Sequence, residues 1–148
     1  MIQLRTFFIA SAMAATLGLT ACNSVPVSNM TALTAKLASA NEVPANSSTG
    51  TGALDASFNK DTNVLTWTVS YSGLTGPVVA GHFHGPAMAG ANAGVALGFS
   101  GSMDSPIKGS ASLTATQAAD LLAGKWYVNL HTAANKGGEI RGQANVAQ

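Results

Sequence analysis

The sequence predicts an all-β protein, an antiparallel Greek-key β-sandwich or barrel that contains one short α-helix. Three observations lead to this prediction. Short runs in which apolar and polar residues alternate recur from Met30 onward, and this period of two is typical of strands with one buried face. Clusters of Gly, Pro, Asn and Ser separate the runs, as in sandwiches and barrels. Only one segment has helical spacing. We expect a single domain over residues 31–146.

Eight runs are expected to form strands. The clearest covers residues 64–71, where Leu, Trp, Val and Tyr at the odd positions alternate with Thr and Ser at positions 66, 68 and 70. The segment before it, Asn-Lys-Asp-Thr-Asn, has the composition of a hairpin turn. In chain order the expected strands are residues 33–38, 52–58, 64–71, 78–84, 94–99, 108–113, 126–131 and 139–146.

The segment with helical spacing begins at Thr114. Residues 114–117, Thr-Ala-Thr-Gln, form a capping box, and the apolar residues within 118–122 share one helical face. Gly124 can end the helix, because glycine readily adopts the left-handed conformation found there. The pattern therefore predicts a short α-helix near residues 115–123.

The first 21 residues have the pattern of a bacterial lipoprotein signal peptide. Arg5 provides a positive charge, and an apolar run follows over residues 7–19. That run is shorter than the about 20 apolar residues that a helix needs to cross a bilayer, and it fits the central region of a signal peptide. Residues 19–22, Leu-Thr-Ala-Cys, resemble a lipobox. We expect residues 1–21 to be cleaved before Cys22, Cys22 to be lipidated, and residues 22–30 to form a tether.

Cys22 is the only cysteine in the chain, so the domain has to fold without an internal disulfide. The alternative to lipidation is an ordinary signal peptide followed by a stray cysteine. Asn23 follows the cysteine, at a position where Asp would favour retention in the inner membrane. We therefore expect an outer-membrane lipoprotein of the bacterial cell envelope that faces the periplasm, with exposure at the cell surface as the alternative.

The charge of the chain excludes some partners. Charged residues make up 9% of the chain, against about 25% in typical soluble domains. Without Arg5 of the signal peptide, six basic and six acidic residues remain. Nucleic-acid binding needs a basic stripe, so we expect no nucleic-acid partner. The expected partners are the membrane, through the lipid on Cys22, and a metal ion. A protein partner or a homodimer is left open.

The three histidines of the chain are the residues that indicate chemistry. His82 and His84 flank Phe83 in an expected strand, and side chains two residues apart on a strand lie on one face about 6.6 Å apart. In residues 126–131, Trp, Val and Leu alternate with Tyr127, Asn129 and His131, which places His131 on the polar face. If the two strands are neighbours, three imidazoles can converge on one metal ion.

Copper is the expected metal, with zinc as the alternative. Imidazole is a good ligand for both ions, and copper binds more tightly in the Irving–Williams order. Water or Met88, four residues after His84, is expected to complete the site, and Met103 is a weaker candidate. The alternative is that the histidines only form hydrogen bonds with loop backbone, because a His-x-His pattern alone is a weak signal.

Four further polar residues are expected around the ligands, where they would orient the imidazoles: Glu42, Asn129, Glu139 and Arg141. Glu42 is interpreted either as a loop anchor or as an acceptor that orients a histidine. Glu139 and Arg141 lie two residues apart and are expected to form a structural ion pair or a loop clamp rather than to act in catalysis.

Several blocks of the sequence resemble, in order, the signature blocks of the CHRD (chordin) domain family. They are Ala-Asn-Glu-Val-Pro (40–44), Tyr-Ser-Gly-Leu-Thr-Gly-Pro (71–77), Gly-His-Phe-His-Gly-Pro-Ala (81–87), Leu-Leu-Ala-Gly-Lys-Trp-Tyr-Val-Asn-Leu-His-Thr (121–132) and Gly-Gly-Glu-Ile-Arg-Gly-Gln (137–143). The resemblance covers about residues 31–146. It implies an exported β-domain, and it predicts no particular reaction.

A weaker similarity is to Cu,Zn superoxide dismutase, which also places a His-x-His on one strand, a third histidine later, and an arginine after a Gly-rich stretch. It implies an immunoglobulin-like or dismutase-like sandwich, copper ligation by the three histidines, and Arg141 near the open copper face. A fourth copper histidine, zinc-subsite histidines and a disulfide are missing from the sequence.

Three functional hypotheses follow. The first is a lipid-anchored copper-binding protein for storage, buffering or handover of the ion, and not an enzyme. The second is a non-enzymatic interaction or structural module of the envelope that binds no metal. The third, ranked last, is a redox enzyme of the dismutase type.

Overall fold

The computed structural model describes residues 29–148. The predicted signal peptide, the lipidation site Cys22 and residues 22–28 of the predicted tether lie outside the described residues. Within residues 29–148, none of the helices combines the length and the apolar character needed to cross a lipid bilayer.

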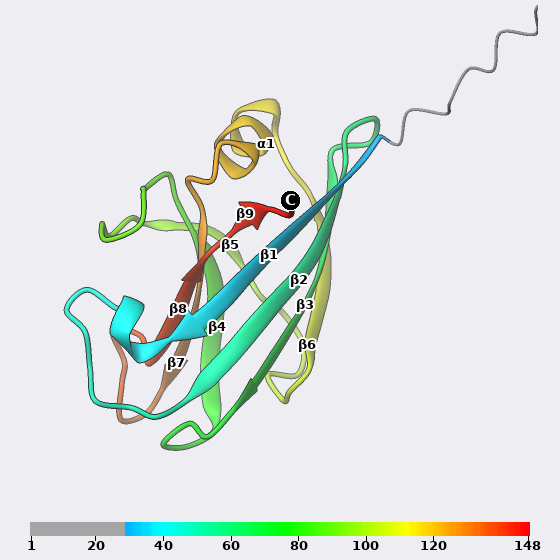
Figure 1. The fold of residues 1–148 in the computed structure, drawn as a ribbon. Helices are drawn as coiled ribbons and strands as arrows, with labels where there is room; N and C mark the ends of the chain where they lie inside the picture. The colour runs from blue at the N-terminus through cyan, green and yellow to red at the C-terminus, as the bar shows by residue number, and fades with distance from the viewer. Residues whose placement is uncertain (1–28) are drawn as a thin grey trace, which may run out of the picture.

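The described part of the chain is built mainly from antiparallel strands (Figure 1). In order, the elements are β1 (Met30–Ala38), the 3-10 helix η1 (Ser39–Asn41), β2 (Thr51–Asn59), β3 (Val64–Ser72), β4 (Val78–His84), β5 (Val95–Gly98), β6 (Ile107–Ser112), α1 (Ala115–Leu122), β7 (Tyr127–Thr132), β8 (Ile140–Gln143) and β9 (Asn145–Val146). The all-β prediction is confirmed.

One sheet contains all the described strands, and it curls back on itself. Its order is β5-β4-β7-β8-β1-β2-β3-β6, with β9 paired to β1. Four strands separate β4 from β3 in this order, yet Phe83 of β4 and Trp67 of β3 are in edge-to-face contact, with ring centroids 5.5 Å apart. Phe99, just after β5, stacks on the same Trp67 at 5.4 Å. The half with β5, β4, β7 and β8 therefore faces the half with β1, β2, β3 and β6, as in a sandwich or half-open barrel.

The core lies between these halves, and the alternation of the sequence explains it. In β1 every second residue is buried, and in β3 Leu65, Trp67 and Val69 point inward. Gly109 of β6 leaves room for the indole, because a Cβ at this position would lie 2.2 Å from Trp67 Cζ2. At about 25 cal/mol per Å² of buried apolar surface, these aromatic and aliphatic side chains provide the main driving force for folding.

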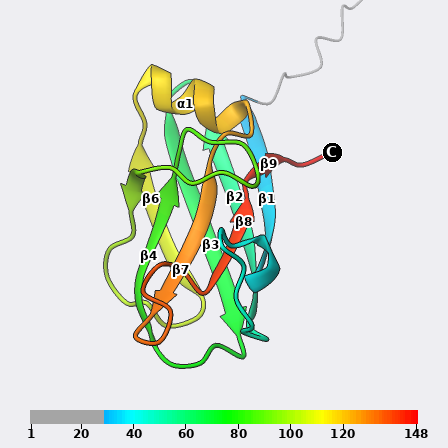
Figure 2. The ribbon, with the colours of Figure 1, turned by 90° about the vertical axis from the view of Figure 1, so that its left-hand side faces the viewer.

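The predicted helix is found in the structure, whereas the last predicted strand is divided in two. α1 begins with the expected capping box between Thr114 and Gln117, and Gly124 follows it with a φ of 69°. Ala118 and Leu121 are buried, so the helix covers one end of the sheet (Figure 2). The single strand expected at 139–146 is instead divided at Ala144 into β8, which pairs with β7 and β1, and β9, which pairs with β1.

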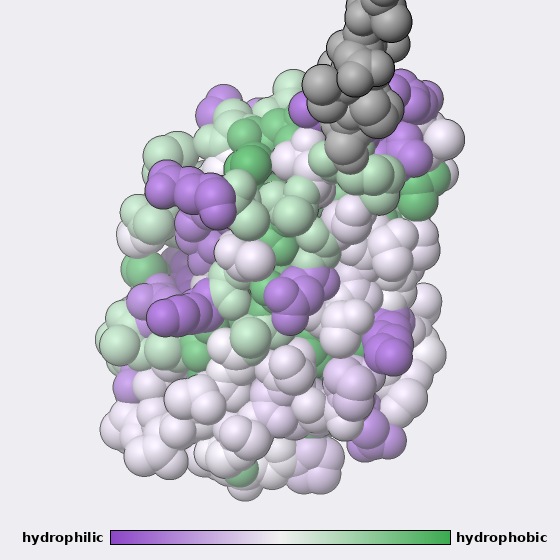
Figure 3. Space-filling view, turned by 45° about the vertical axis from the view of Figure 1, so that its right-hand side comes forward, coloured by the Kyte–Doolittle hydropathy of each residue, from purple (hydrophilic) through white to green (hydrophobic). Residues whose placement is uncertain are grey.

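One face of the surface shows how hydrophilic residues are distributed. On the face seen in Figure 3, strongly hydrophilic residues form separate spots among residues of intermediate hydropathy. This is consistent with the 9% of charged residues in the chain.

Candidate metal centre

The three histidines lie on the outer face of two neighbouring strands. β4 pairs with β7, and in this ladder His82 lies opposite Asn129 and Ala80 lies opposite His131. Phe83 points into the core and is fully buried, so the side chains of His82 and His84 lie on the other face of β4. The structure thus pairs the two strands as expected. It also places the histidines on the face opposite the core, as expected.

The three imidazoles converge. One ring nitrogen from each of His82, His84 and His131 lies within 4.8 Å of the other two, and His82 Nδ1 is 3.2 Å from His131 Nε2. We call these three residues the histidine cluster. Ligand nitrogens at about 2.0–2.1 Å from a tetrahedral metal ion lie about 3.3 Å apart. Small side-chain movements would therefore bring all three nitrogens onto one ion.

Backbone carbonyls determine which nitrogen of two of these rings carries the proton. Nδ1 of His84 lies 3.0 Å from the carbonyl oxygen of Ala93, and Nδ1 of His131 lies 3.0 Å from that of Lys136. A carbonyl oxygen only accepts hydrogen bonds, so both Nδ1 atoms donate, and each Nε2 atom carries the lone pair of its ring. Metal-binding histidines typically have this arrangement, because the bond to the carbonyl orients the ring and raises its basicity as a ligand.

The lone pair of His84 has no protein donor to satisfy it. Nε2 of His84 is buried and has no hydrogen-bond partner among the described residues. The lone pair of His131 Nε2 faces His82 Nδ1, which donates this hydrogen bond when no metal is bound. A metal ion would replace that one bond and would also satisfy His84 Nε2.

The surroundings keep two of the imidazoles neutral. Burial lowers the pKa of His82 and of His84 below the usual 6.5, and the neighbouring rings lower the pKa of each further. Arg141 adds to this effect on His84, whereas the hydrogen bond to Ala93 opposes it. A neutral imidazole is the form that binds metal, so at neutral pH these two rings are ready to act as ligands.

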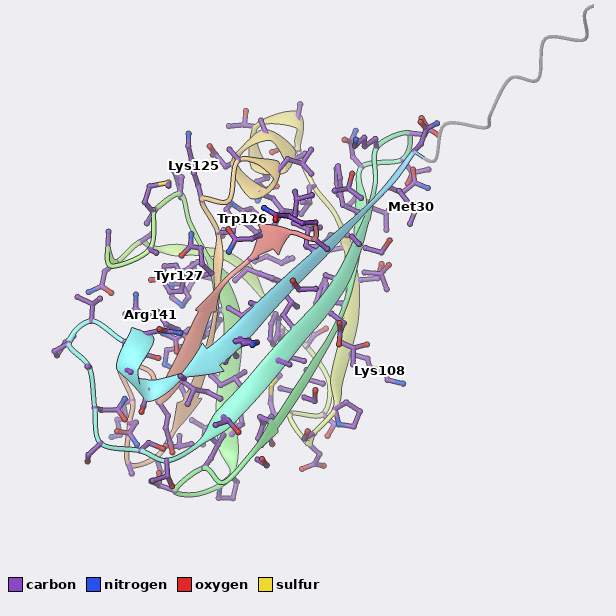
Figure 4. The ribbon with its side chains drawn as sticks, in the orientation of Figure 1. Met30, Lys108, Lys125, Trp126, Tyr127 and Arg141 are labelled. Carbon is purple, nitrogen blue, oxygen red and sulfur yellow. The ribbon has the colours of Figure 1, made fainter. Side chains whose placement is uncertain are left out.

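His84 packs against Tyr127, which in turn packs against Arg141. The ring of Tyr127 lies parallel to that of His84, at 5.0 Å between centroids and 5° between planes. The guanidinium of Arg141 lies 4.6 Å from the centre of the Tyr127 ring, and both residues are on one side of the molecule in Figure 4. Tyr127 is the residue near the cluster that the sequence interpretation did not single out. Its alternation with Asn129 and His131 was the signal that could have indicated it.

Arg141 pairs with Glu42 and not with Glu139. Its Nε donates to Glu42 Oε2 at 2.8 Å in a buried ion pair. Its two other nitrogens donate to the carbonyl of Ala91 and to Asn92 Oδ1. The expected ion pair between Glu139 and Arg141 is therefore wrong. Glu139 lies just before β8, and its carboxylate binds Ser48, Thr75 and Thr132 instead. Arg141 instead joins the 42–46 loop to the 85–94 loop, which both lie beside β4, β7 and β8 (Figure 1).

Glu139 is the centre of a separate cluster, which we call the Glu139 clamp. Its Oε1 accepts hydrogen bonds from Ser48 Oγ and the Thr75 amide, and its Oε2 accepts from the hydroxyls of Thr75 and Thr132. Burial would raise the pKa of Glu139, but these four hydrogen bonds outweigh burial and lower the pKa to about 2. The expected role of Glu139 as a loop clamp agrees with these contacts, and it lies apart from the histidine cluster.

The two methionines that were expected as possible ligands, Met88 and Met103, lie in a loop and against the core. Met88 lies in the 85–94 loop with 62% of its surface exposed, and its carbonyl accepts a hydrogen bond from Ala91. Met103 packs against the core, and its carbonyl accepts a hydrogen bond from the Tyr71 hydroxyl. The nitrogens of the histidine cluster thus meet without a contribution from Met103.

Comparison with known proteins gives one match. A family model described as the CHRD domain matches residues 33–144, which includes every residue of the histidine cluster and of the Glu139 clamp. No curated protein and no solved structure matches the chain.

Proposed function

The chain belongs to the CHRD domain family, and we propose that this member is a metal-binding protein that holds a copper ion on His82, His84 and His131. The observation that carries the proposal is the buried Nε2 of His84, which has a lone pair and no hydrogen-bond partner among residues 29–148. If the histidines served only to hydrogen-bond the loops, a buried ring nitrogen of this kind would be an uncompensated cost.

Copper is proposed over zinc because of the donor set. The cluster offers three imidazole nitrogens and no carboxylate or thiolate within the group. Copper(II) binds such nitrogen donors more tightly than zinc does in the Irving–Williams order. When bound, the ion would supply a redox-active Lewis acid. Met88 remains the proposed soft ligand for Cu(I), since its loop follows His84 directly.

We further propose that the protein acts at the cell envelope, in storage, buffering or handover of the metal. The support is the sequence of residues 1–22, with its apolar run and the Leu-Thr-Ala-Cys block. Lipidation of Cys22 would hold the domain at the outer membrane, facing the periplasm. A test is mass spectrometry of the protein isolated from membranes, where a mature chain that starts at an acylated Cys22 is expected.

Metal titration tests the central proposal. The purified protein is expected to bind about one Cu(II) per chain in competition with a chelator, and the nitrogen couplings in its electron paramagnetic resonance spectrum should arise from imidazole. The double variant His82→Ala, His84→Ala should lose this binding by at least a hundredfold, because two of the three donors are removed.

Zinc(II) titrated in the same way distinguishes the metals, and the variant Met88→Leu tests the proposed thioether with Cu(I). Stoichiometric copper binding by the double histidine variant would refute the site. Failure of the wild-type protein to bind copper or zinc would leave the second hypothesis, an envelope module whose imidazoles are only hydrogen-bonded.

A further inference from the structure

Tyr127 is a large aromatic residue on the outer face of the sheet, and it is nevertheless buried. Its neighbour Val128 points into the core, so the Tyr127 ring lies on the face that carries the histidine cluster. Only 2% of Tyr127 is exposed. Its contacts on this face are with the imidazole of His84, the guanidinium of Arg141 and the backbone of Ala93.

The ring of Tyr127 supports the plane of the His84 imidazole. The two residues lie directly opposite each other in the ladder between β4 and β7. Their rings are parallel within 5°, with centroids 5.0 Å apart, and parallel stacking is one of the favoured arrangements of aromatic pairs. Rotation of the imidazole out of this plane would lose the contact. The stack therefore favours the ring orientation in which His84 Nδ1 meets the Ala93 carbonyl.

The hydroxyl of Tyr127 holds the loop residue that accepts from His84. The amide of Ala93 donates to the Tyr127 hydroxyl oxygen at 3.1 Å, and this oxygen lies 3.5 Å from the carbonyl oxygen of Ala93. The same carbonyl accepts the hydrogen bond from His84 Nδ1 at 3.0 Å. Tyr127 thus contacts both partners of that bond, the imidazole through its ring and Ala93 through its hydroxyl.

The loop needs such contacts because its own side chains bury little surface. Residues 85–94, Gly-Pro-Ala-Met-Ala-Gly-Ala-Asn-Ala-Gly, are mainly glycine and alanine. Glycine loses more conformational freedom on ordering than any other residue, and alanine has only a methyl group to bury. Met88, the largest side chain of the loop, is 62% exposed. Hydrogen bonds from outside the loop therefore fix its path, and the hydroxyl of Tyr127 makes one of them at the residue that meets His84.

Arg141 keeps the Tyr127 ring in place. Its guanidinium carbon lies over the ring, 4.6 Å from the ring centre, and contacts between arginine and an aromatic face are attractive. The guanidinium is itself fixed, because Nε donates to Glu42 at 2.8 Å and Nη2 donates to Asn92 at 2.7 Å. The phenol is therefore held by a buried ion pair before any metal binds.

We propose that Tyr127 is a positioning residue of the histidine cluster, which holds His84 in the form with a proton on Nδ1 and with the lone pair of Nε2 available to a metal ion. The part of this inference that concerns metal rests on the function proposed above. The positioning itself belongs to the metal-free protein.

Loss of the hydroxyl should act on His84 through Ala93. Without it, the Ala93 amide loses its acceptor and the carbonyl of the same residue is held less firmly. The proton of the neutral imidazole then has less reason to stay on Nδ1, and a fraction of the molecules carries it on Nε2. That form has no lone pair on Nε2, so it binds metal only after the proton has moved. Residues that orient a ligating histidine typically contribute about 10–100-fold to metal affinity.

Nitrogen-15 NMR of the metal-free full chain at about pH 7.5 tests the positioning without copper. The wild type is expected to show one His84 tautomer, with a protonated Nδ1 and an unprotonated Nε2. In Tyr127→Phe, which keeps the stacked ring, the shifts of the two nitrogens should move toward each other as the tautomers mix. The Ala93 amide hydrogen should exchange about fivefold faster in this variant, as expected for the loss of one hydrogen bond.

The matched control is Tyr71→Phe. Its hydroxyl donates to the carbonyl of Met103 at 2.7 Å from β3, so the substitution also removes one phenol hydroxyl and one bond to a backbone carbonyl. The His84 shifts and the Ala93 exchange rate should stay as in the wild type. A Tyr127→Phe protein with the same single His84 tautomer and the same Ala93 exchange rate as this control would overturn the proposal.

Copper titration of the same proteins tests the part that concerns metal. Tyr127→Phe is expected to bind one Cu(II) per chain about tenfold more weakly than the wild type. Tyr127→Leu, which also removes the stacked ring, should bind more weakly still, and Tyr71→Phe should bind as the wild type does. Equal copper affinity in the wild type and in both Tyr127 variants would overturn the proposed effect on the metal. A wild type that binds neither copper nor zinc, but whose His84 tautomer depends on Tyr127, would refute the proposed function and leave the positioning intact.

Discussion

Two buried glutamates in this protein have opposite surroundings. Glu139 receives four hydrogen bonds, which use both of its oxygens, and its pKa is lowered to about 2. Glu42 receives bonds on Oε2 only, and its Oε1 has no partner among the described residues. Burial, the largest influence on it, raises the pKa of Glu42, although Arg141 opposes this effect.

The difference separates a structural cluster from a candidate ligand site. A carboxylate whose lone pairs are all satisfied by protein donors holds loops together and has nothing left to offer. A carboxylate that is buried with one oxygen unsatisfied by the described residues, and that lies within electrostatic reach of His131, still has an acceptor to offer. Counting donors and acceptors thus distinguishes two sites that look alike in sequence.

The largest effect on stability is expected at the Glu139 clamp. In Glu139→Gln, the new amide hydrogens would face donors of Thr75 or Thr132, so the free energy of unfolding should fall by about 3 kcal/mol. Copper stoichiometry should stay the same, because none of the four hydrogen bonds of Glu139 involves an imidazole. Urea denaturation and metal titration of the same variant measure both quantities.

The matched control for this variant is Asp120→Asn. Asp120 forms a partly exposed ion pair with Lys125 at 3.4 Å, and such pairs contribute about 0.5 kcal/mol or less. A Glu139→Gln protein as stable as this control would remove the contrast between the two glutamates.

Metal binding should produce the next largest effect, and it should depend on the histidine cluster alone. At free Cu(II) a hundredfold above Kd, the free energy of unfolding should rise by about 2.7 kcal/mol, visible as a higher Tm in a thermal melt. His131→Ala should lose most of this increase, whereas Glu139→Gln should retain it from a lower starting Tm. An equal rise in Tm for His131→Ala would show that copper binds elsewhere.

The smallest effect concerns pH in the metal-free protein. The pKa values of His82 and His84 are lower in the folded state than the usual 6.5, so the unfolded chain binds more protons as the solution is acidified. The contribution of these two histidines to the free energy of unfolding is therefore complete above pH 6.5. It is lost as the pH falls toward their pKa values in the folded state. By the same reasoning, the contribution of Glu139 to the free energy of unfolding is lost below pH 4.5, as the pH approaches its folded pKa of about 2.

Urea midpoints measured between pH 7.5 and 5 test this assignment. The double variant His82→Ala, His84→Ala should lose the decline below pH 6.5 and keep the decline below 4.5. A variant that keeps the full decline below pH 6.5 would show that other groups cause it.

Much of the fold was accessible from the sequence because strand and helix periods are local. The alternation around Phe83 gave the correct faces of β4, and the capping box gave the start of α1. The division of residues 139–146 at Ala144 was not accessible. It depends on which neighbouring strand each half meets, and β1 lies about a hundred residues earlier in the chain.

The candidate site was accessible in its ligand residues but not in its contacts. The shared face of His82, His84 and His131 followed from the alternation of side chains along a strand. It also needed one assumption, that β4 and β7 are neighbours. The partner of Arg141 did not follow, because Glu42 sits in a loop whose path is set by tertiary packing. For the same reason, no local pattern indicated that Ala93 and Lys136 would provide the carbonyls.

Those two carbonyls have a consequence for how such a centre can change over evolution. Ala93 and Lys136 take part through main-chain oxygen, which every amino acid possesses. Mutations at these residues can leave the proton arrangement of the imidazoles untouched, while insertions or deletions that shift the loop path would alter it. Divergence in metal affinity among related chains should therefore follow loop length rather than residue identity.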